Sequence, residues 1–399
     1  MSMQPVLRFK TKEYGLKAWD KTHLSQIATV TMGQSPSSDA YNEDYDGLPL
    51  IQGNADIVEG FTKPSRYTTE VTKRCQESDV ILSVRAPVGE LGIASEESCI
   101  GRGVCAIRAN DKSDTAFIYQ LLQAKKKQWK TLEQGSTFTA VGGEEVKEFG
   151  LAVPTKEEQL KIAAFFTALD EKTRLSQQKL TLVKNIKNGI LKKIFSQEVR
   201  FKNTDGSFFK PWKSYTVGEL AEVIGGGTPS TQNSDYWDGD IYWFTPAEIN
   251  SKYVHSSNRK ITVNGLNNSS AKLLPKGALL LTTRATLGAC SINNQDIPVC
   301  TNQGFQSLVC NDFVDNEFMY YVVTTNAFQK AMVQMASGST FLEISSKNLK
   351  SITVNLPSLE EQQQIATLLS SLDEKINCLK QRVEVLKTQK ASFMQQMFV

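Results

Sequence analysis

The feature that most constrains the fold of this chain is a long internal match. Residues 135–195 align with residues 338–398 at a constant offset of 203, without a gap and with about 19 identities in 61 positions. The identical positions include Pro154 and Pro357, the tripeptide EEQ at 157–159 and 360–362, and the tetrapeptide LDEK at 169–172 and 372–375. Self-similarity at a fixed period is the signature of a repeated structural unit. The chain therefore consists of two copies of one unit.

The match extends toward the beginning of each copy. Arg8-Phe9-Lys10 followed by Trp19 corresponds to Arg200-Phe201-Lys202 followed by Trp212, and residues 83–95 are similar to residues 282–293. Between the matched blocks, residues 40–75 and 233–275 differ in length and sequence. A shared scaffold that carries two different segments indicates one task performed on two different targets.

The first part of each copy is predicted to be rich in strands. Residues 81–87 and 279–285 are short runs of Leu, Ile, Val and Thr, and Gly and Pro punctuate the neighbouring sequence, which favours strands. Helical patterns intervene at 116–132 and 317–332. The predicted fold class is α+β: two pseudo-symmetric α/β domains, at 1–154 and 199–357, separated by two long antiparallel coiled-coil helices.

The second part of each copy predicts one long helix, over 155–198 and over 358–399. Apolar residues recur every 3.5 residues on average, which is typical of a coiled-coil seam. In the first helix the seam is predicted at Ile162, Phe165, Leu169, Ser176, Val183, Ile186 and Ile190. In the second helix it is predicted at Ile365, Leu368, Leu372, Leu379, Leu386 and Phe393. Each stripe needs a partner, and the helix of the other copy is favoured over packing of each helix on its own domain alone.

The residues needed for most enzyme chemistry are missing from the sequence. Only His23 and His255 are present, no GxxxxGK[ST] phosphate loop occurs, and no Asn/Asp-Pro-Pro-aromatic tetrapeptide marks an amino-methyltransferase. The seven cysteines form no CxxC pair, so neither a disulfide framework nor a zinc site is indicated. We expect buried free thiols, no metal site and no catalytic activity in this chain.

The doubled set of motifs closely resembles the specificity subunits of type I restriction–modification systems. The most specific element is GSTF, an apolar segment ending in Pro, EEQxxIA and LDEK, at 135–172 and again at 338–375. The resemblance implies that each variable domain is a target recognition domain for one half of a split DNA sequence, and that the helices form a spacer. It also implies assembly with two modification subunits and two restriction subunits. S-adenosylmethionine, ATP and Mg²⁺ are expected only in those partner subunits.

Candidate DNA contacts were chosen from residue type and position. Arg85 and Arg284 stand at equivalent strand ends of the two copies, and arginine is the usual bidentate partner of guanine. In the divergent segment of the first copy the candidates are Gln52, Asn54, Lys63, Arg66, Lys73 and Arg74. In the second copy they are Tyr236, Trp243, Thr245, Asn250, Lys252, Arg259 and Lys260. In the GSTF segments, the hydroxyls of Ser136, Thr137, Ser339 and Thr340 could bind phosphate, although we favour a role for Phe138 and Phe341 in anchoring each domain to its helix.

The small net charge of the chain is compatible with a function other than DNA binding. The formal net charge is only +3, so composition alone does not indicate a nucleic-acid partner. An adaptor that binds proteins through both domains and has no DNA role is the alternative, and a stand-alone enzyme acting on nucleic acid is a third. No run of 18 apolar residues and no apolar leader is present, so we expect a cytoplasmic protein without a membrane partner.

Overall fold

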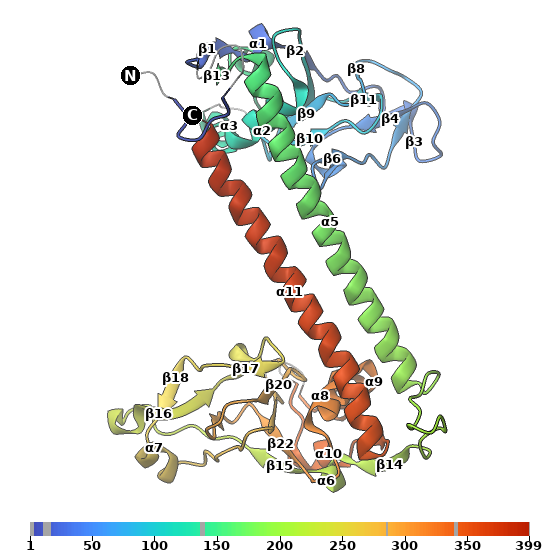
Figure 1. The fold of residues 1–399 in the computed structure, drawn as a ribbon, viewed down its shortest axis with the longest axis vertical. Coiled ribbons are helices and arrows are strands. Elements are labelled where there is room, and N and C mark those ends of the chain that lie inside the picture. Colours follow the sequence, from blue (N-terminus) through green and yellow to red (C-terminus); the bar gives the residue numbers. More distant parts are fainter. Residues whose placement is uncertain (1–3, 11–16, 136–139, 285, 339–341, 399) are drawn as a thin grey trace. The chain divides into compact units, whose positions relative to one another are not determined.

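The duplication is visible in the fold of the computed structural model, which describes residues 4–10, 17–135, 140–284, 286–338 and 342–398. Contacts divide the chain into two units: unit 1 contains residues 1–178 and 379–399, and unit 2 contains residues 179–378. Each unit therefore takes half of each long helix. These helices are α5 (Lys156–Phe195) and α11 (Leu359–Met397), the green and red ribbons of Figure 1.

Unit 1 contains three sheets, with strand orders β2-β12-β9-β10-β6-β5, β3-β7-β4-β11-β8 and β1-β13. The strands are β1 (Asp20–His23), β2 (Ala28–Met32), β3 (Tyr41–Asn42), β4 (Leu48–Ile51), β5 (Ile57–Val58), β6 (Phe61–Thr62), β7 (Tyr67–Thr68), β8 (Arg74–Cys75), β9 (Val80–Ser83), β10 (Leu91–Ile93), β11 (Ser98–Ile100), β12 (Val104–Ala109) and β13 (Gly150–Val153). Short helices connect them: α1 (Leu24–Ile27), α2 (Thr115–Ala124), α3 (Lys126–Gly135) and α4 (Gly143–Lys147), with 3-10 turns η1 (Ser38–Ala40) and η2 (Asn54–Asp56).

Unit 2 repeats this plan with strand orders β15-β22-β19-β20-β17, β18-β16-β21 and β14-β23. Its strands are β14 (Lys213–Thr216), β15 (Ala221–Gly225), β16 (Trp237–Phe244), β17 (Tyr253–Val254), β18 (Arg259–Ile261), β19 (Leu279–Leu281), β20 (Cys290–Asn293), β21 (Cys300–Thr301), β22 (Gln306–Cys310) and β23 (Thr353–Leu356). Its helices are α6 (Val217–Leu220), α7 (Val263–Asn267), α8 (Asn316–Thr324), α9 (Asn326–Met335) and α10 (Ser346–Ser351), with 3-10 turns η3 (Ser234–Tyr236) and η4 (Pro246–Glu248). The five strands of the main sheet of unit 2 correspond, in the same order, to the first five of the six strands in the main sheet of unit 1.

The core of each unit joins its main sheet to the long helices. In unit 1, Leu82 of β9 and Phe117 of α2 are fully buried in one cluster with Phe166 of α5 and Phe398. In unit 2, Leu281 of β19 and Phe318 of α8 are buried with Leu369 of α11. The β-branched and Leu-rich strands therefore bury one face against α2 or α8, and that helix in turn covers the long helices.

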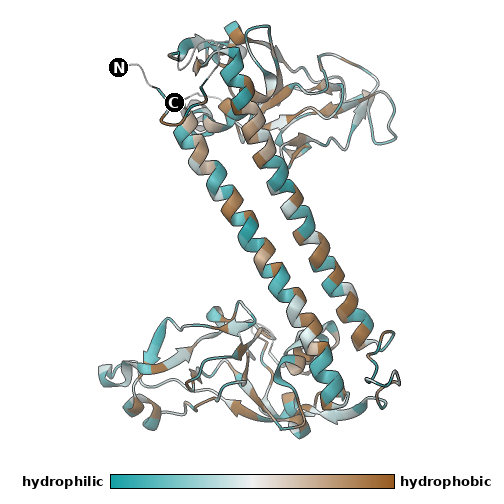
Figure 2. Ribbon diagram, in the orientation of Figure 1, coloured by the Kyte–Doolittle hydropathy of each residue, from teal (hydrophilic) through white to brown (hydrophobic). Residues whose placement is uncertain are grey.

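The two long helices pack antiparallel within each unit, which confirms the predicted coiled coil and disfavours packing of each helix on its own domain alone. In unit 1 the rings of Phe165 and Phe393 meet at 5.1 Å between centroids. In unit 2, Ile194 near the end of α5 shares a cluster with Ile365 near the beginning of α11. Apolar residues recur along both helices in Figure 2.

All but one of the predicted seam residues are buried or half-buried, and the prediction for Ile186 is wrong. Those buried are Ile162, Ser176, Val183, Ile365, Leu379 and Leu386, and those half-buried are Phe165, Leu169, Ile190, Leu368, Leu372 and Phe393. Ile186 is 43% exposed because, after Val183, the helix presents the position four residues later, Lys187, to its partner. Sequence reasoning also missed seam residues that the structure buries: Phe166, Leu180, Ile194, Leu369, Ile376 and Val383.

Candidate nucleic-acid interface

The repeated motifs hold the scaffold together. Arg8 donates two hydrogen bonds, of 3.0 and 2.6 Å, to the carboxylate of Glu158, which is the second Glu of the first EEQ. Arg200 makes the same pair with Glu361, at 3.2 and 2.7 Å. Both carboxylates are buried, and bidentate Arg–carboxylate pairs are the strong, geometrically defined kind. The Arg-Phe-Lys and EEQ segments therefore fasten the beginning of each copy to its long helix.

The glutamine of each EEQ fastens a second segment to the same helix end. The amide of Gln159 donates to the carbonyl oxygens of Pro154 and Lys112 and accepts from the hydroxyl of Ser113. Gln362 likewise donates to the carbonyl oxygens of Pro357 and Phe313. These bonds fix the loop that leads into α2 or α8. The GSTF serines, threonines and phenylalanines (Ser136, Thr137, Phe138, Ser339, Thr340 and Phe341) lie outside the described residues.

Five of the six candidates in the divergent segment of unit 1 are exposed. Lys63, Arg66 and Lys73 make no ion pair within the described ranges, whereas Arg74 is paired with Glu97 at 2.9 Å. Asn54 is exposed at the beginning of η2, and Gln52 is half-buried, with its backbone N–H bonded to Asp56. Three unpaired cations are therefore available to an anionic partner, while Arg74 is partly neutralised.

Three of the candidates of unit 2, Trp243, Arg259 and Lys260, lie on the ribbon formed by β16 and β18. Arg259 is exposed, and its guanidinium lies 3.5 Å above the ring of Trp237. Lys260 lies over the ring of Tyr242 at 4.6 Å. Thr245, at the end of β16, donates its hydroxyl to Glu248, and Asn250 is exposed in the loop that follows. Tyr236 is half-buried in η3.

Two predicted contacts of unit 2 are corrected by burial. Trp243 is only 6% exposed, and its ring N–H donates to the carbonyl oxygen of Gly227 at 2.8 Å. The Lys252 side chain is about 10% exposed and forms an ion pair with Glu317. Because a base-reading side chain must reach a groove with its donors free, neither residue meets that requirement, and both have structural roles instead.

Arg85 and Arg284 are both exposed but have different partners. Arg284 forms an ion pair with Glu343 at 2.6 Å, whereas Arg85 makes no ion pair within the described ranges and only bridges the backbone of Ala140. The equivalent position in the two copies is thus occupied by one free and one paired guanidinium. Of the two, Arg85 is the stronger candidate for a phosphate or base.

Lys252 belongs to a buried polar network that sequence reasoning missed. Its ammonium group contacts the Tyr321 hydroxyl at 3.0 Å and the Ser370 hydroxyl at 2.8 Å. Tyr321 in turn donates to Asp373 of the second LDEK at 2.6 Å. Burial, together with the bond to Asp373, holds the pKa of Tyr321 well above its usual value. The network connects a divergent segment to α8 and α11. No motif in the sequence predicts it.

Unit 1 has a glycine, Gly60, at the position that Lys252 occupies in unit 2. The backbone of Gly60 accepts a hydrogen bond from Ile93, as that of Lys252 does from Ile292, so Gly60 and Lys252 occupy equivalent positions. A hollow of about 590 Å³ lies beside this segment of unit 1, lined by Phe61 and Lys63 on one side and by Glu171 and Arg174 of α5 on the other. The two copies therefore connect their variable segments to the helices differently.

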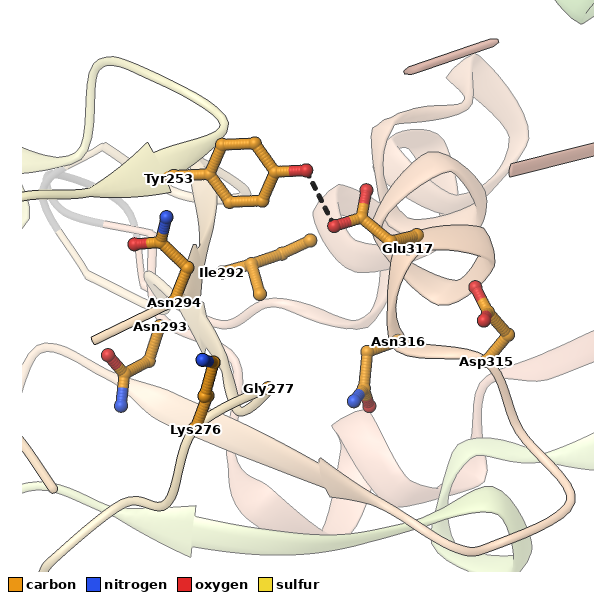
Figure 3. Close-up of a pocket in the computed structure, with 9 residues that line it drawn as sticks. All are labelled: Tyr253, Lys276, Gly277, Ile292, Asn293, Asn294, Asp315, Asn316 and Glu317. Carbon is orange, nitrogen blue, oxygen red and sulfur yellow. Dashed lines mark hydrogen bonds between the residues drawn. The ribbon is translucent and has the colours of Figure 1, made fainter. Parts of the chain in front are cut away.

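A smaller pocket of about 210 Å³ lies beside the Lys252 network in unit 2 (Figure 3). Its lining includes three amides, Asn293, Asn294 and Asn316, and the Tyr253 hydroxyl, which donates to Glu317 at 2.7 Å. Within the described residues, no group of three or more His, Cys, Asp or Glu side chains is arranged to hold a metal ion.

The cysteines follow the prediction of free thiols, but two of the seven are not fully buried. Cys75, Cys99, Cys105, Cys290 and Cys300 are buried, Cys310 is half-buried and Cys378 on α11 is exposed. Burial raises the pKa of Cys75 to about 11 and that of Cys105 to about 12, which disfavours the reactive thiolate. Among the helices of the described residues, none combines the length and the apolar character that a membrane span requires.

Comparison with protein families gives one clear match. The family model described as "Type I restriction modification DNA specificity domain" matches twice, at residues 17–185 and 210–388. The two matched regions cover most of the chain, and each begins before the first sheet of one copy and ends in one long helix. The internal duplication is thus a duplication of this domain.

Individual relatives agree with the family match. The chain is 39% identical over 197 residues to the MjaIX specificity subunit of Methanocaldococcus jannaschii, covering 48% of the chain and 45% of the relative. A putative MjaX specificity subunit of the same organism is 31% identical over 199 residues, or 49% of the chain and 47% of the relative. The chain thus spans about half the length of these two relatives. The MjaVIII specificity subunit is 19% identical over 394 residues, covering 94% of the chain and 91% of the relative.

Solved structures show the same fold. The S subunit of a type I restriction–modification system from M. genitalium superposes with a TM-score of 0.67 at 16% identity, covering 100% of this chain and 99% of that chain. A chain from a study of assembly and conformational transition of the type I system gives a TM-score of 0.55 at 20% identity, covering 95% and 97% of the two chains. The similarity therefore extends over both copies and both long helices.

Proposed function

Because the chain belongs to the family of type I restriction–modification DNA specificity domains, we propose that it is the sequence-reading subunit of a type I complex. Each of its two recognition domains, at 1–154 and 199–357, binds one half of a bipartite site in double-stranded DNA, and the paired helices set the gap between the halves. The observation that carries this proposal is the doubled family match, with one copy in each unit and with unlike, cation-bearing segments on a like scaffold.

The residues of the two units support a division into scaffold and reader. The motifs that recur in both copies form hydrogen bonds within the protein, such as those that Glu158 and Glu361 accept from Arg8 and Arg200. The divergent segments carry exposed cations that form no ion pair within the described ranges, such as Lys63, Arg66 and Arg259. Cations at phosphates position a protein on DNA, and side chains at base edges provide specificity. A protein that reads different half-sites on one scaffold needs this division.

The chemistry is assigned to partners of this chain. We place adenine methylation in two modification subunits that use S-adenosylmethionine, and translocation and cleavage in two restriction subunits that use ATP and Mg²⁺. The specificity subunit provides the DNA contacts and the assembly surface, and it works in the cytoplasm.

The test is co-expression with the modification subunits encoded by the same host, followed by sequencing of methylated DNA. We expect adenine methylation at a single bipartite motif, and none from the chain alone. Methylation without a split motif, or methylation by the purified chain, would contradict the proposal. If the complete complex neither methylates DNA nor binds random duplex at low salt, the protein-binding adaptor is the correct function.

A further inference from the structure

A buried side chain of unit 2 holds the guanidinium of Arg259 in one orientation. Its guanidinium lies 3.5 Å over the ring of Trp237, within the range of a strong cation–π contact. Trp237 is only 5% exposed, and its ring N–H donates to the carbonyl oxygen of Ser230 at 3.0 Å, so the ring cannot turn freely. Stacking leaves the N–H edge of a guanidinium available for planar, bidentate bonds. The charged group is therefore presented by a fixed platform.

The strand that carries Arg259 is fixed as well. Trp237 meets Trp243 edge to face at 5.1 Å between centroids, and Trp243 pairs with Arg259 across the ribbon of β16 and β18. Glu248 accepts from the backbone N–H groups of Thr245 and Asn258, which closes the loop before β18. A side chain on such a support loses little conformational freedom when it binds, which favours affinity and discrimination.

The Arg259 guanidinium is left without a carboxylate. Asp238 and Asp240 lie on the irregular part of β16, yet neither forms an ion pair with Arg259 in the described ranges. This separates Arg259 from Arg74 and Arg284, whose charges are met by Glu97 and Glu343. Its donors are therefore free for an external acceptor.

Unit 1 places an arginine at the same position of the same sheet. Leu50 of β4 lies opposite Cys99 of β11 in a parallel pair, as Trp243 of β16 lies opposite Cys300 of β21. On the other side of the strand, the backbone N–H of Leu50 donates to the carbonyl oxygen of Arg66. Arg66 is thus the counterpart of Arg259, although residues 40–75 and 233–275 differ in sequence. An exposed arginine retained at one position of two divergent surfaces points to a shared task.

We infer that Arg259, stacked on Trp237, reads a guanine in the half-site of unit 2 by bidentate hydrogen bonds to its O6 and N7 atoms, and that Arg66 occupies the corresponding reading position in unit 1. The inference depends on the proposed function. Arginine to guanine is the commonest base-specific contact in the major groove, and one such pair discriminates against a wrong base by about 5- to 150-fold. Trp237 is a positioning residue for this contact.

The test uses the complex of the full chain with its modification subunits and a pool of duplexes in which one half-site at a time is randomised. Bound duplexes are sequenced for the wild type, Arg259→Ala, Arg259→Lys, Trp237→Phe and Arg66→Ala. Lys276→Met is the control, because it removes an exposed cation of unit 2 that is already paired with Asp296. Melting temperatures establish that each variant is folded.

In the unit 2 half-site, we expect the wild type to require guanine at one position and Arg259→Ala to lose that preference about 10- to 100-fold. Arg259→Lys keeps the positive charge but lacks the planar guanidinium that makes two parallel hydrogen bonds, so it should lose the preference at the same position. This variant tests the inference even if Arg259→Ala binds DNA too weakly to be measured. Trp237→Phe should relax that position alone, Arg66→Ala should relax one position of the other half-site, and Lys276→Met should change none.

Three results would overturn the inference. Binding of Arg259→Ala that is uniformly weaker, with an unchanged motif and a shallower salt dependence, would make Arg259 a phosphate contact. An unchanged motif at unchanged affinity would make it a surface residue, and relaxation of the same half-site by Arg259→Ala and by Arg66→Ala would show that the two arginines do not serve separate half-sites. In all three cases the proposed function stands. If the wild-type complex selects no motif at all, it is the proposed function that fails.

Discussion

Lys390 of α11 contacts Asp170 of α5, with 2.6 Å between Nζ and Oδ1, and the same relationship recurs between Lys187 and Asp373 at 2.5 Å. The aspartates belong to the two LDEK motifs. Asp373 corresponds to Asp170 and Lys390 corresponds to Lys187, each at the repeat offset of 203 residues. Each pair lies within one unit, Lys390 with Asp170 in unit 1 and Lys187 with Asp373 in unit 2. A charge pair inside an apolar seam sets the register of two helices, so the LDEK motif encodes how the helices meet.

Substitution of Asp170 by Asn should weaken the pairing in unit 1. The two side chains are 22% and 36% exposed, between the regimes of a surface and a buried ion pair, so we expect a loss of about 1–2 kcal/mol in the free energy of unfolding. Denaturant unfolding with a double-mutant cycle on Asp170→Asn and Lys390→Met measures the coupling. Additive effects of the two substitutions would show that the pair contributes no coupling energy.

Glu361 provides a larger effect with a matched control. Its carboxylate is fully buried and accepts from Arg200 and, at 3.3 Å, from the ring N–H of Trp212. Glu361→Gln removes the charge that Arg200 is buried against, and breaking a buried pair costs about 3–5 kcal/mol. Glu360→Gln changes an exposed neighbour in the same turn and should cost less than about 0.5 kcal/mol. Equal midpoints for the two variants in chemical denaturation would contradict this account.

The seam of α5 is tested by two leucines that lie two positions apart in the sequence but differ in their surroundings. Leu180 is 4% exposed and Leu182 is 58% exposed. Leu180→Ala should cost about 2–5 kcal/mol because it removes buried methyl groups and leaves a cavity. Leu182→Ala should change stability by at most about 0.5 kcal/mol. If urea unfolding ranks the two variants the other way, the burial pattern of α5 is incorrect.

Much of the scaffold could be predicted from the sequence because it was written twice. The EEQ and LDEK motifs located both long helices to within a few residues, and Arg8 and Arg200 could be matched before their partners were known. The phase of the seam was less certain, because Ile186 and Lys187 compete for one position and apolarity alone favours Ile186. The helix presents Lys187, whose charge is met by Asp373, and a stripe of apolar residues contains no signal for that choice.

The divergent segments could not be interpreted in the same way. Residue type marked Lys252 and Trp243 as DNA contacts, but their surroundings are set by residues far away in sequence, such as Glu317 and Gly227. Trp237 was overlooked because its contact with Arg259 is made across a two-stranded ribbon. The aromatic-rich run at 235–244 was the only local signal. Contacts of this kind become visible only when the strand register is known.

The buried tyrosines of unit 2 predict a loss of stability in alkali. Burial raises the pKa of Tyr253, Tyr320 and Tyr321, and bonds to Glu317 and Asp373 add to the rise for Tyr253 and Tyr321. A pKa raised in the folded state contributes stability that is present below the unfolded value of 10.0 and is lost as the pH rises above it. Tyr321→Phe should flatten the fall in melting temperature between about pH 9.5 and 11. Tyr45→Phe, at a side chain that is 76% exposed, should leave the slope of melting temperature against pH unchanged. An unchanged slope for Tyr321→Phe would show that the Tyr321 hydroxyl is not buried.

The spacer role predicts a change in the gap without a change in the half-sites. Seven residues inserted after Gln178 in α5 and seven after Cys378 in α11 preserve the 3.5-residue stripe and lengthen each helix by about 10 Å. This length corresponds to about three base pairs at 3.4 Å each. Methylome sequencing of a host that carries the variant should give both original half-sites with a longer gap. An insertion in α5 alone should abolish methylation, because it breaks the pairing of Lys187 with Asp373. Altered half-sites after the paired insertion would mean that the helices contribute to sequence reading and are more than a spacer.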